Sequence, residues 1–279
     1  INDEEKSVID PHADKKSNAI EKRKVLLVED NHELLNVLSN LFSSTYEVVM
    51  AHNGKEGLDK AHEEFPDIIV SDIMMPEMTG IELCETIKSD FNLCHIPIVL
   101  LTALASTQQN IEGLTKGADD YITKPFNTSI LLVRCNNLVH NRLMLQKKFQ
   151  QQGYTDTEVI ANNPIDQHFL DALNSVIENH IDDTEFNIDH LACALGLSRS
   201  SLYAKFKSLT GITPNDYILS KKIKRAAHLL QSTQLQITEI SDMLGFGSSR
   251  YFTRCFKKSF GIAPSEYRKK ENSAEKLSE

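Results

Sequence analysis

Polar residues suited to a metal or phosphate site follow four short apolar runs in the first half of the chain. The runs cover residues 25–28, 68–70, 98–101 and 121–122, and the polar residues after them are Glu29, Asp30, Asp72, Thr102 and Lys124. Short apolar runs separated by helix-like stretches are typical of buried parallel strands. Because the carboxyl ends of parallel strands meet at one crevice of an open sheet, we expect these five side chains to lie together.

The types of these side chains predict which ligands the site binds, in addition to where it lies. Three carboxylates in a small site require a cation, and oxygen ligands suit Mg²⁺. A lysine and a hydroxyl opposite that metal suit a phosphoryl group. Each feature alone has an ordinary explanation: Glu29-Asp30 as a cap before the next helix, Asp72 as a cap or loop residue, Thr102 as a strand residue and Lys124 as a surface charge. Four such explanations would have to coincide at four strand ends, so the set favours a functional site.

Five alternating strand and helix segments are predicted from residue 24 to about residue 127. The expected strands are 24–28, 46–51, 68–72, 97–102 and 119–123, and the expected helices are 32–43, 54–64, 80–89, 106–116 and one from 127 onward. Gly54 and Gly80 mark helix starts, and Asn127 is a candidate N-cap. The alternation predicts a doubly wound α/β domain with a parallel sheet.

Four motifs, VLLVEDN, VSDIMMPEMTG, VLLTA and DDYITKPF, stand where the receiver domains of two-component response regulators have theirs. Residues 24–140 therefore resemble a CheY-like receiver domain. The resemblance implies a flavodoxin-like, five-stranded parallel sheet with strand order 2-1-3-4-5. It also implies that Asp72 accepts a phosphoryl group from a histidine kinase.

The same resemblance implies roles for the residues around Asp72. The implied ligands of Mg²⁺ are Glu29, Asp30, Asp72 and the backbone carbonyl of Met74. Thr102 and Lys124 are implied to contact the phosphoryl oxygens, and Thr102 and Tyr121 to act as the switch pair. The bond between Lys124 and Pro125 is expected to be a cis peptide, which turns the lysine back into the crevice.

Two other classes of function use a similar acidic α/β domain. A Mg²⁺-dependent phosphatase of the haloacid-dehalogenase kind usually has a second aspartate two positions after the first, where this chain has Met74. A degenerate receiver that serves only as an interaction module would lack part of the acidic and basic set, which is complete here. Apart from phosphoryl acceptance and autodephosphorylation, this segment is not expected to be an enzyme.

Residues 141–164 are predicted to form a helical extension and a linker. An apolar stripe at a spacing of three and four, interrupted at Arg142, consists of Leu131, Cys135, Leu138, Leu145 and Phe149. Such a stripe either packs on its own domain or forms the seam of a homodimer through the receiver. Residues 1–23 are predicted to be a charged linker and residues 271–279 a polar tail.

An internal repeat defines the last part of the chain, which is predicted to be all-α. IDHLACALG at 188–196 matches ITEISDMLG at 237–245, and the residues that follow match at an offset of 50. Gly196 and Gly245 stand at helix ends, and Ser198 and Ser248 are candidate N-caps of the next helices. Each half is therefore a helix-turn-helix unit, whose second helix is of the kind that enters a DNA major groove.

The charge of this region supports a double-stranded DNA partner. Residues 190–270 carry 14 lysines and arginines against four acidic residues, although the whole chain has a net charge of −9. A cationic α-helical bundle without DNA binding would share the charge but not the duplicated helix-turn-helix. Residues 165–270 resemble an AraC/XylS-type DNA-binding domain, most closely in ITEISDMLGFGSSRYFTRCFKKSFGIAPSEYRK, which implies a connecting helix over about 214–230. The residues expected to face DNA are Arg199, Ser200, Tyr203, Ser249, Arg250 and Arg254.

These interpretations together predict a phosphorylation-dependent transcriptional regulator. The order of its domains resembles the C-terminal end of a hybrid two-component sensor, whose histidine kinase lies in the same chain; a free-standing response regulator is the alternative. We expect a cytoplasmic segment, or the cytoplasmic end of a membrane-bound hybrid, with no membrane contact of its own, because its longest apolar stretch is too short to cross a bilayer. The five cysteines are scattered, and Cys84 and Cys193 are expected to be buried thiols in a reducing compartment.

Overall fold

The computed structural model describes residues 22–103, 117–151, 160–161 and 163–275. Five strands form one parallel sheet in the order β2-β1-β3-β4-β5, which confirms the predicted order. They are β1 (Arg23–Val28), β2 (Tyr46–Ala51), β3 (Ile68–Asp72), β4 (Ile98–Thr102) and β5 (Asp120–Thr123). The helices of this domain are α1 (His32–Ser43), α2 (Gly54–Glu64), α3 (Gly80–Ser89) and α5 (Thr128–Gln151). The helix predicted at 106–116 lies outside the described residues.

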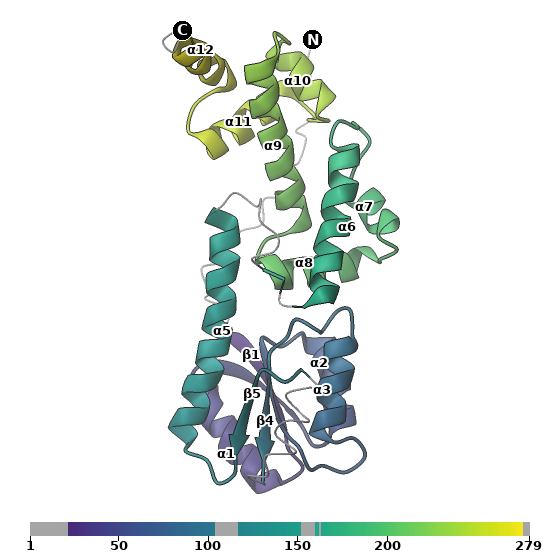
Figure 1. Ribbon diagram of the computed structural model, residues 1–279, viewed down its shortest axis with the longest axis vertical. Coiled ribbons are helices and arrows are strands. Elements are labelled where there is room, and N and C mark those ends of the chain that lie inside the picture. Colours follow the sequence, from purple (N-terminus) through teal and green to yellow (C-terminus); the bar gives the residue numbers. More distant parts are fainter. Residues whose placement is uncertain (1–21, 104–116, 152–159, 162, 276–279) are drawn as a thin grey trace, which may run out of the picture.

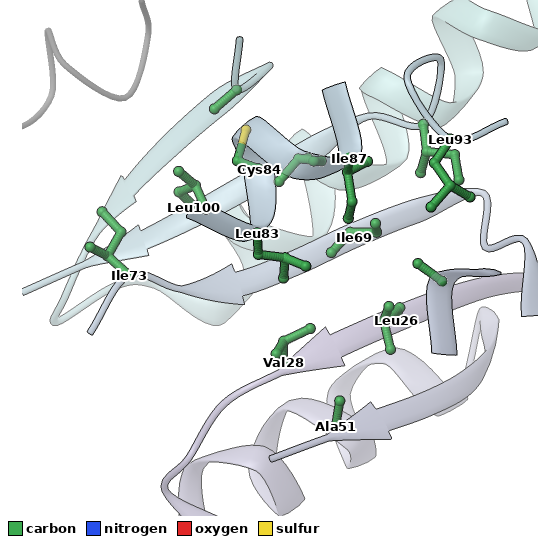
Figure 2. Packing of buried hydrophobic residues seen from close by; sticks show 14 of the residues in the cluster. Leu26, Val28, Ala51, Ile69, Ile73, Leu83, Cys84, Ile87, Leu93 and Leu100 are labelled. Carbon is green, nitrogen blue, oxygen red and sulfur yellow. The ribbon is translucent and has the colours of Figure 1, made fainter. Parts of the chain in front are cut away.

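Both faces of the sheet are buried, which explains the nearly continuous apolar runs of its strands. One face packs against α2 and α3, and Figure 2 shows Leu26 and Ile69 of the strands together with Leu83 and Ile87 of α3. The opposite face packs against α1 and α5 through the alternate strand residues, such as Leu27. This sandwich fixes the strand ends, and with them the polar residues that follow.

Side chains cap the N-termini of the helices that start beside the crevice. Asn31 accepts hydrogen bonds from the first turn of α1 at 3.0 and 3.1 Å, a role that was not predicted for it. Thr79 and Glu82 form a reciprocal capping box at the start of α3. Asn127 accepts from Ser129 N at 2.8 Å and so caps α5, as predicted. The caps hold the helix starts close to the carboxyl ends of β1, β3 and β5.

Helix α5 is longer than the receiver needs, and it continues beside the second domain (Figure 1). Leu131 and Cys135 of its apolar stripe are buried in the receiver core, whereas Phe149 is buried in the core of the helical domain. The stripe therefore packs within this chain. Of the two interpretations of the stripe, packing on its own chain is the one that the structure supports.

The second domain is all-α, as predicted. Its helices are α6 (Pro164–His180), α7 (Ile188–Ala194), α8 (Arg199–Thr210), α9 (Pro214–Ser232), α10 (Ile237–Met243), α11 (Ser249–Phe260) and α12 (Pro264–Glu275). Helix α9 joins two helix-turn-helix units, α7–α8 and α10–α11, each with a core of its own (Figure 1). Gly196 and Gly245 have φ of 67° and 65°, and Ser198 and Ser248 cap α8 and α11. The repeated turns thus have the predicted conformations.

The prediction for Cys193 is wrong, whereas Cys84 is buried as expected. Helix α7 buries Ile188, Leu191 and Ala192, and the position after them turns toward solvent. Among the described residues, no helix has both the length and the apolar character needed to span a membrane.

Candidate functional site

Three carboxylates meet at the carboxyl ends of β1 and β3. Glu29 and Asp30 follow β1, Asp72 ends β3, and one oxygen of each lies within 4.8 Å of the others. Glu29 and Asp72 are only 1% and 7% exposed, whereas Asp30 is open to solvent. Two members of the cluster are therefore buried and the third is accessible to solvent, although Asp72 was expected to be exposed at the crevice.

The ammonium of Lys124 bridges two of these carboxylates. Its Nζ lies 2.9 Å from Glu29 Oε2 and 3.0 Å from Asp72 Oδ1. The backbone of Lys124 donates to the carbonyl of Thr102 at 2.6 Å, and the peptide bond to Pro125 is cis, as predicted. One ammonium against three carboxylates leaves an excess of negative charge at the site.

Burial and hydrogen bonding affect the pKa values of Glu29 and Lys124 differently. Burial raises the pKa of Glu29, and the hydrogen bond from Lys124 offsets only part of this effect. Burial also acts to lower the pKa of Lys124, but the hydrogen bonds to Glu29 and Asp72 outweigh it, so the net pKa is raised. The lysine therefore remains charged within the cluster at neutral pH.

The carboxylate of Asp72 is oriented by the start of the following loop. Its Oδ1 accepts from Ile73 N at 2.9 Å, and Oδ2 makes no hydrogen bond among the described residues. Helix α3 begins at Gly80, whose amide donates to Ile73 O at 3.0 Å. A Cβ at Gly80 would lie 2.0 Å from the carbonyl oxygen of Asp72, so only glycine permits this approach.

The remaining predicted receiver residues border the same crevice or support it. Thr102 ends β4 and is 2% exposed. Tyr121 lies on β5 against the core beneath α3, and its hydroxyl is buried without a hydrogen-bond partner in the part of the chain that the structure describes. Burial raises the pKa of Tyr121 to about 12. Met74 lies in the loop after Asp72 with its side chain 66% exposed.

The residues predicted to face DNA lie on the surfaces of α8 and α11. Arg199, Ser200, Arg250 and Arg254 are exposed, whereas Tyr203 and Ser249 are half-buried. Arg199 pairs with Asp189 at 3.2 Å, and the guanidinium of Arg254 lies 5.3 Å from the ring centre of Tyr251.

Sequence reasoning missed Tyr251 on this surface. Its side chain is 41% exposed, and it lines the same groove as Arg199 and Tyr203. An aromatic residue in the first turn of a recognition helix is a signal that the sequence already contained.

Comparisons with known proteins cover both domains. A family model described as "Response regulator receiver domain" matches residues 25–136, and one described as "Helix-turn-helix domain" matches residues 191–270. The chain is 39% identical over 247 residues to Histidine kinase P4 of Formosa agariphila, which covers 88% of this chain and 18% of that protein. It is 41% identical over 114 residues to the probable transcriptional regulator ycf27 of Guillardia theta, which covers 40% of this chain and 44% of that protein.

A solved receiver domain of a signal transduction histidine kinase from Syntrophus aciditrophicus is 34% identical, with a TM-score of 0.41, over 42% of this chain and 90% of that one. The chain thus spans less than half the length of both named sequence relatives. The chain therefore contains a response regulator receiver domain in its N-terminal part and a helix-turn-helix domain of the AraC type in its C-terminal part.

Proposed function

We propose that Asp72 accepts a phosphoryl group from a histidine kinase and that this modification controls DNA binding by the two helix-turn-helix units. The observation that carries the proposal is the Lys124 ammonium, which lies within 3.0 Å of both Glu29 and Asp72. A fixed positive charge beside the Asp72 carboxylate, at the carboxyl end of its strand, supports a role for Asp72 as the nucleophile.

The chemistry follows from the environment of Asp72. A free carboxylate oxygen attacks phosphorus in line, so the new P–O bond forms while the bond from phosphorus to the donor nitrogen breaks. Lys124 provides a point charge for the oxygens of the transferred group, and the hydroxyl of Thr102 is the neighbouring hydrogen-bond donor. The product is an acyl phosphate, which water hydrolyses to restore the signal-free state.

The carboxylate cluster fits a divalent cation. Glu29, Asp30 and Asp72 offer hard oxygen atoms within 4.8 Å of one another, and one lysine leaves their charge only partly neutralised. These residues, with the backbone carbonyl of Met74, would hold Mg²⁺, the ion that such oxygen sets suit. Mg²⁺ bound there would neutralise negative charge on the phosphoryl oxygens.

Thr102 and Tyr121 are proposed to transmit the effect of phosphorylation at Asp72. A dianion at Asp72 attracts the hydroxyl of Thr102, and Tyr121 on the adjacent strand is free to repack because its hydroxyl has no partner among the described residues. Burying a polar hydroxyl without a partner costs free energy, so alternative packings of this ring are close in energy.

The DNA-binding role rests on the repeated units and on their exposed cations. Arg250 and Arg254 on α11 are proposed to contact a groove or phosphates, together with Arg199, Ser200 and Tyr203 on α8 and Ser249 on α11. The two units are proposed to read one face of a duplex, with recognition helices about 34 Å apart.

We propose that this segment is part of a hybrid two-component sensor. The long match to a histidine kinase, of which the chain covers only 18%, supports that origin over a free-standing regulator. The kinase would then be part of the same chain, and the segment would lie in the cytoplasm. Sequencing upstream of Ile1 tests this, because a kinase ATP-binding domain is expected there and its absence would favour the free-standing regulator.

A homodimer through the receiver is also proposed, on a different surface from the predicted stripe. Ile130 and Val133 of α5 are 53% and 56% exposed and lie one turn apart, whereas the stripe itself is largely buried. Sedimentation with and without the phosphoryl mimic beryllofluoride tests this surface, and Val133→Glu should prevent any association.

Phosphoryl acceptance is tested by intact-mass measurement with Mg²⁺ and a small phosphodonor. The wild-type chain should gain one base-labile phosphoryl group, and Asp72→Asn should gain none. Asp67→Asn is a matched control, because Asp67 lies just before the other end of the same strand. Equal labelling of wild type and Asp72→Asn would show that the phosphoacceptor is misassigned.

A further inference from the structure

A cavity of about 700 Å³ lies where helix α8 docks against the receiver, beside the end of α5 (Figure 1). Ser208 of α8 hydrogen-bonds to His95 of the receiver, and Arg142 Nη2 of α5 donates to Ser208 O at 3.0 Å. Lys205, on the same helix, lies 3.1 Å from the sulfur of Cys94. Residues of the receiver, of α5 and of α8 all line the cavity, whose size is typical of a small-molecule site.

The cavity lies at the opposite edge of the sheet from the phosphoacceptor. Its receiver wall includes Arg23 and Lys24 at the start of β1, and Asp67 just before β3. Asp72 stands at the other end of β3. Because the strands are parallel, their amino ends share one edge and their carboxyl ends the other. A ligand in the cavity would therefore be separate from the metal and phosphoryl site.

Positive charge predominates in the lining of the cavity. Six lysines and arginines line it, against two carboxylates. Both carboxylates are already paired, Asp67 with Arg23 at 3.0 Å and Glu64 with Lys24 at 2.5 Å. In the part of the chain that the structure describes, the lining cations that form no ion pair are Lys22, Arg142, Lys147 and Lys207. The cavity therefore has an excess of positive charge.

Arg142 is withdrawn from water without a counter-ion. Among the described residues its guanidinium donates to two carbonyl oxygens, those of His95 and Ser208. Asp166, the carboxylate whose charge acts most strongly on Arg142, is paired with Lys205. Burial lowers the pKa of Arg142 to about 10, so the guanidinium is charged at neutral pH. A desolvated charge is stabilised by an opposite charge beside it, which an anion in the cavity would supply.

Lys147 and Lys207 extend the positive charge over two walls of the cavity. They lie on α5 and α8, respectively, and both are exposed. Within the described chain, neither ammonium contacts a carboxylate or a carbonyl at the end of α8. Gln146 and Gln150 already donate to those carbonyls, at 2.8 and 3.1 Å. Lysine and arginine are the side chains that hold phosphate groups, so this set suits a ligand with more than one phosphate.

Phe65 gives the same cavity an aromatic wall. It ends α2, and its side chain is 39% exposed. Its backbone has φ of 46° and ψ of 63°, in the left-handed region that bulky side chains rarely adopt. Strained residues of this kind concentrate at ligand-binding positions. An exposed ring close to an excess of positive charge suits a ligand that has both an aromatic ring and phosphates.

We propose that this cavity binds a nucleoside diphosphate, with its phosphates on Arg142, Lys147 and Lys207 and its base against Phe65. Two phosphates supply the negative charge that the lining lacks, and the cavity is too small to admit a DNA duplex. The nucleotide is a second input to the regulator, at a site separate from Asp72. Since its walls come from both domains, bound nucleotide contacts the receiver and α8 together.

Calorimetric titration of the full chain with ADP, GDP, CDP and UDP tests the proposal. The buffer contains EDTA and no Mg²⁺, so that metal at the carboxylate cluster does not bind phosphate. At least one of the four should bind with a Kd below about 1 mM. Lys147→Gln with Lys207→Gln should weaken this binding at least about tenfold, because two charged contacts are lost.

Lys148→Gln with Lys257→Gln is the matched control and should bind as the wild type does. Lys148 is exposed on α5, Lys257 is the counterpart of Lys207 in the repeat, and neither lines the cavity. Phe65→Gly separates the base from the phosphates, since glycine accepts the left-handed backbone. It should weaken nucleotide binding at least about fivefold and leave the binding of inorganic pyrophosphate unchanged.

Several results would overturn the proposal. Binding of none of the four nucleotides would do so, as would equal nucleotide affinity in the wild type and in the double lysine variant or Phe65→Gly. If the wild type binds no nucleotide and the double variant loses affinity for a duplex selected from a random pool, the lysines serve the DNA backbone instead.

The inference and the proposed function fail separately. Asp72→Asn should bind the nucleotide as the wild type does, because its side chain lies at the other edge of the sheet. Loss of nucleotide binding in Asp72→Asn would place the nucleotide at the phosphoacceptor crevice and refute the cavity site. Absence of phosphoryl labelling at Asp72, with nucleotide binding retained, would refute the proposed function alone.

Discussion

Replacing Gly80 with alanine should damage both the stability and the chemistry of the receiver. The added Cβ would lie 2.0 Å from the carbonyl oxygen of Asp72 and 2.9 Å from its carbonyl carbon. Both atoms belong to the backbone of a buried strand, so relief requires α3 and β3 to move apart. Such overpacking costs about 1–3 kcal/mol, and the helix preference of alanine returns about 0.5–1 kcal/mol. We expect a net loss of about 1–2 kcal/mol.

The loss should appear as a decrease of about 5–15 °C in the melting temperature of the receiver, and as faster hydrogen exchange in peptides from β3 and α3. Displacement of Asp72 by about 1 Å should slow labelling by a small phosphodonor, by up to about 100-fold. Gly247→Ala is the control, because nothing lies within 4 Å of its added Cβ. If Gly80→Ala matches the wild type in melting temperature and labelling rate, the close approach of α3 to Asp72 is wrong.

The other predictions concern charges. Without Mg²⁺, Lys124→Ala should lower the free energy of unfolding by about 1–3 kcal/mol, measured as a lower urea midpoint. Millimolar Mg²⁺ should restore part of the lost stability, and an unchanged midpoint would count against the carboxylate cluster. Arg250→Ala or Arg254→Ala should weaken DNA binding by about 1–3 kcal/mol if the arginine contacts a base. If it contacts a phosphate, the substitution should reduce the dependence of DNA affinity on salt concentration. Unchanged binding in both variants would show that α11 is not part of the DNA interface. Burial, with Arg142 and the nearby lysines, holds the pKa of His95 well below its usual range, so docking of α8 should be fully present above about pH 6.5 and weaken about tenfold for each pH unit below it. Cys94 alkylation corrected by Cys193 measures this, and a flat ratio from pH 7.5 to 5.5 would contradict it.

Most of the receiver could be predicted because its signals are local. Each strand is a short apolar run with a polar residue at its end, and the observed strands differ from the predicted ones by one residue at most. The crevice followed from the topology, since parallel strands bring Glu29, Asp72 and Lys124 to one edge whatever the details of packing. The cap at Asn31 was missed although its residue type favours that role.

The contact between the domains could not be predicted from the sequence. Cys94 and Lys205 are 111 positions apart, and no periodicity relates a receiver loop to a recognition helix. Lys205 stands between apolar positions of α8 and suggests only a solvated charge until Asp166 and the receiver are placed beside it. Arg142 likewise interrupts an apolar stripe for a reason that lies on another helix. The exposure of Cys193 was also mispredicted, since a shift of one position around a short helix decides whether a side chain is buried or exposed.

The most direct test of the central claim is the affinity for a selected duplex, measured by titration with and without beryllofluoride in wild type and in Asp72→Asn. Control of DNA binding by phosphorylation predicts that the mimic changes the wild-type affinity by about 5–150-fold and leaves the affinity of Asp72→Asn unchanged. Equal affinities of the wild type with and without bound mimic, or the same shift in Asp72→Asn, would contradict it.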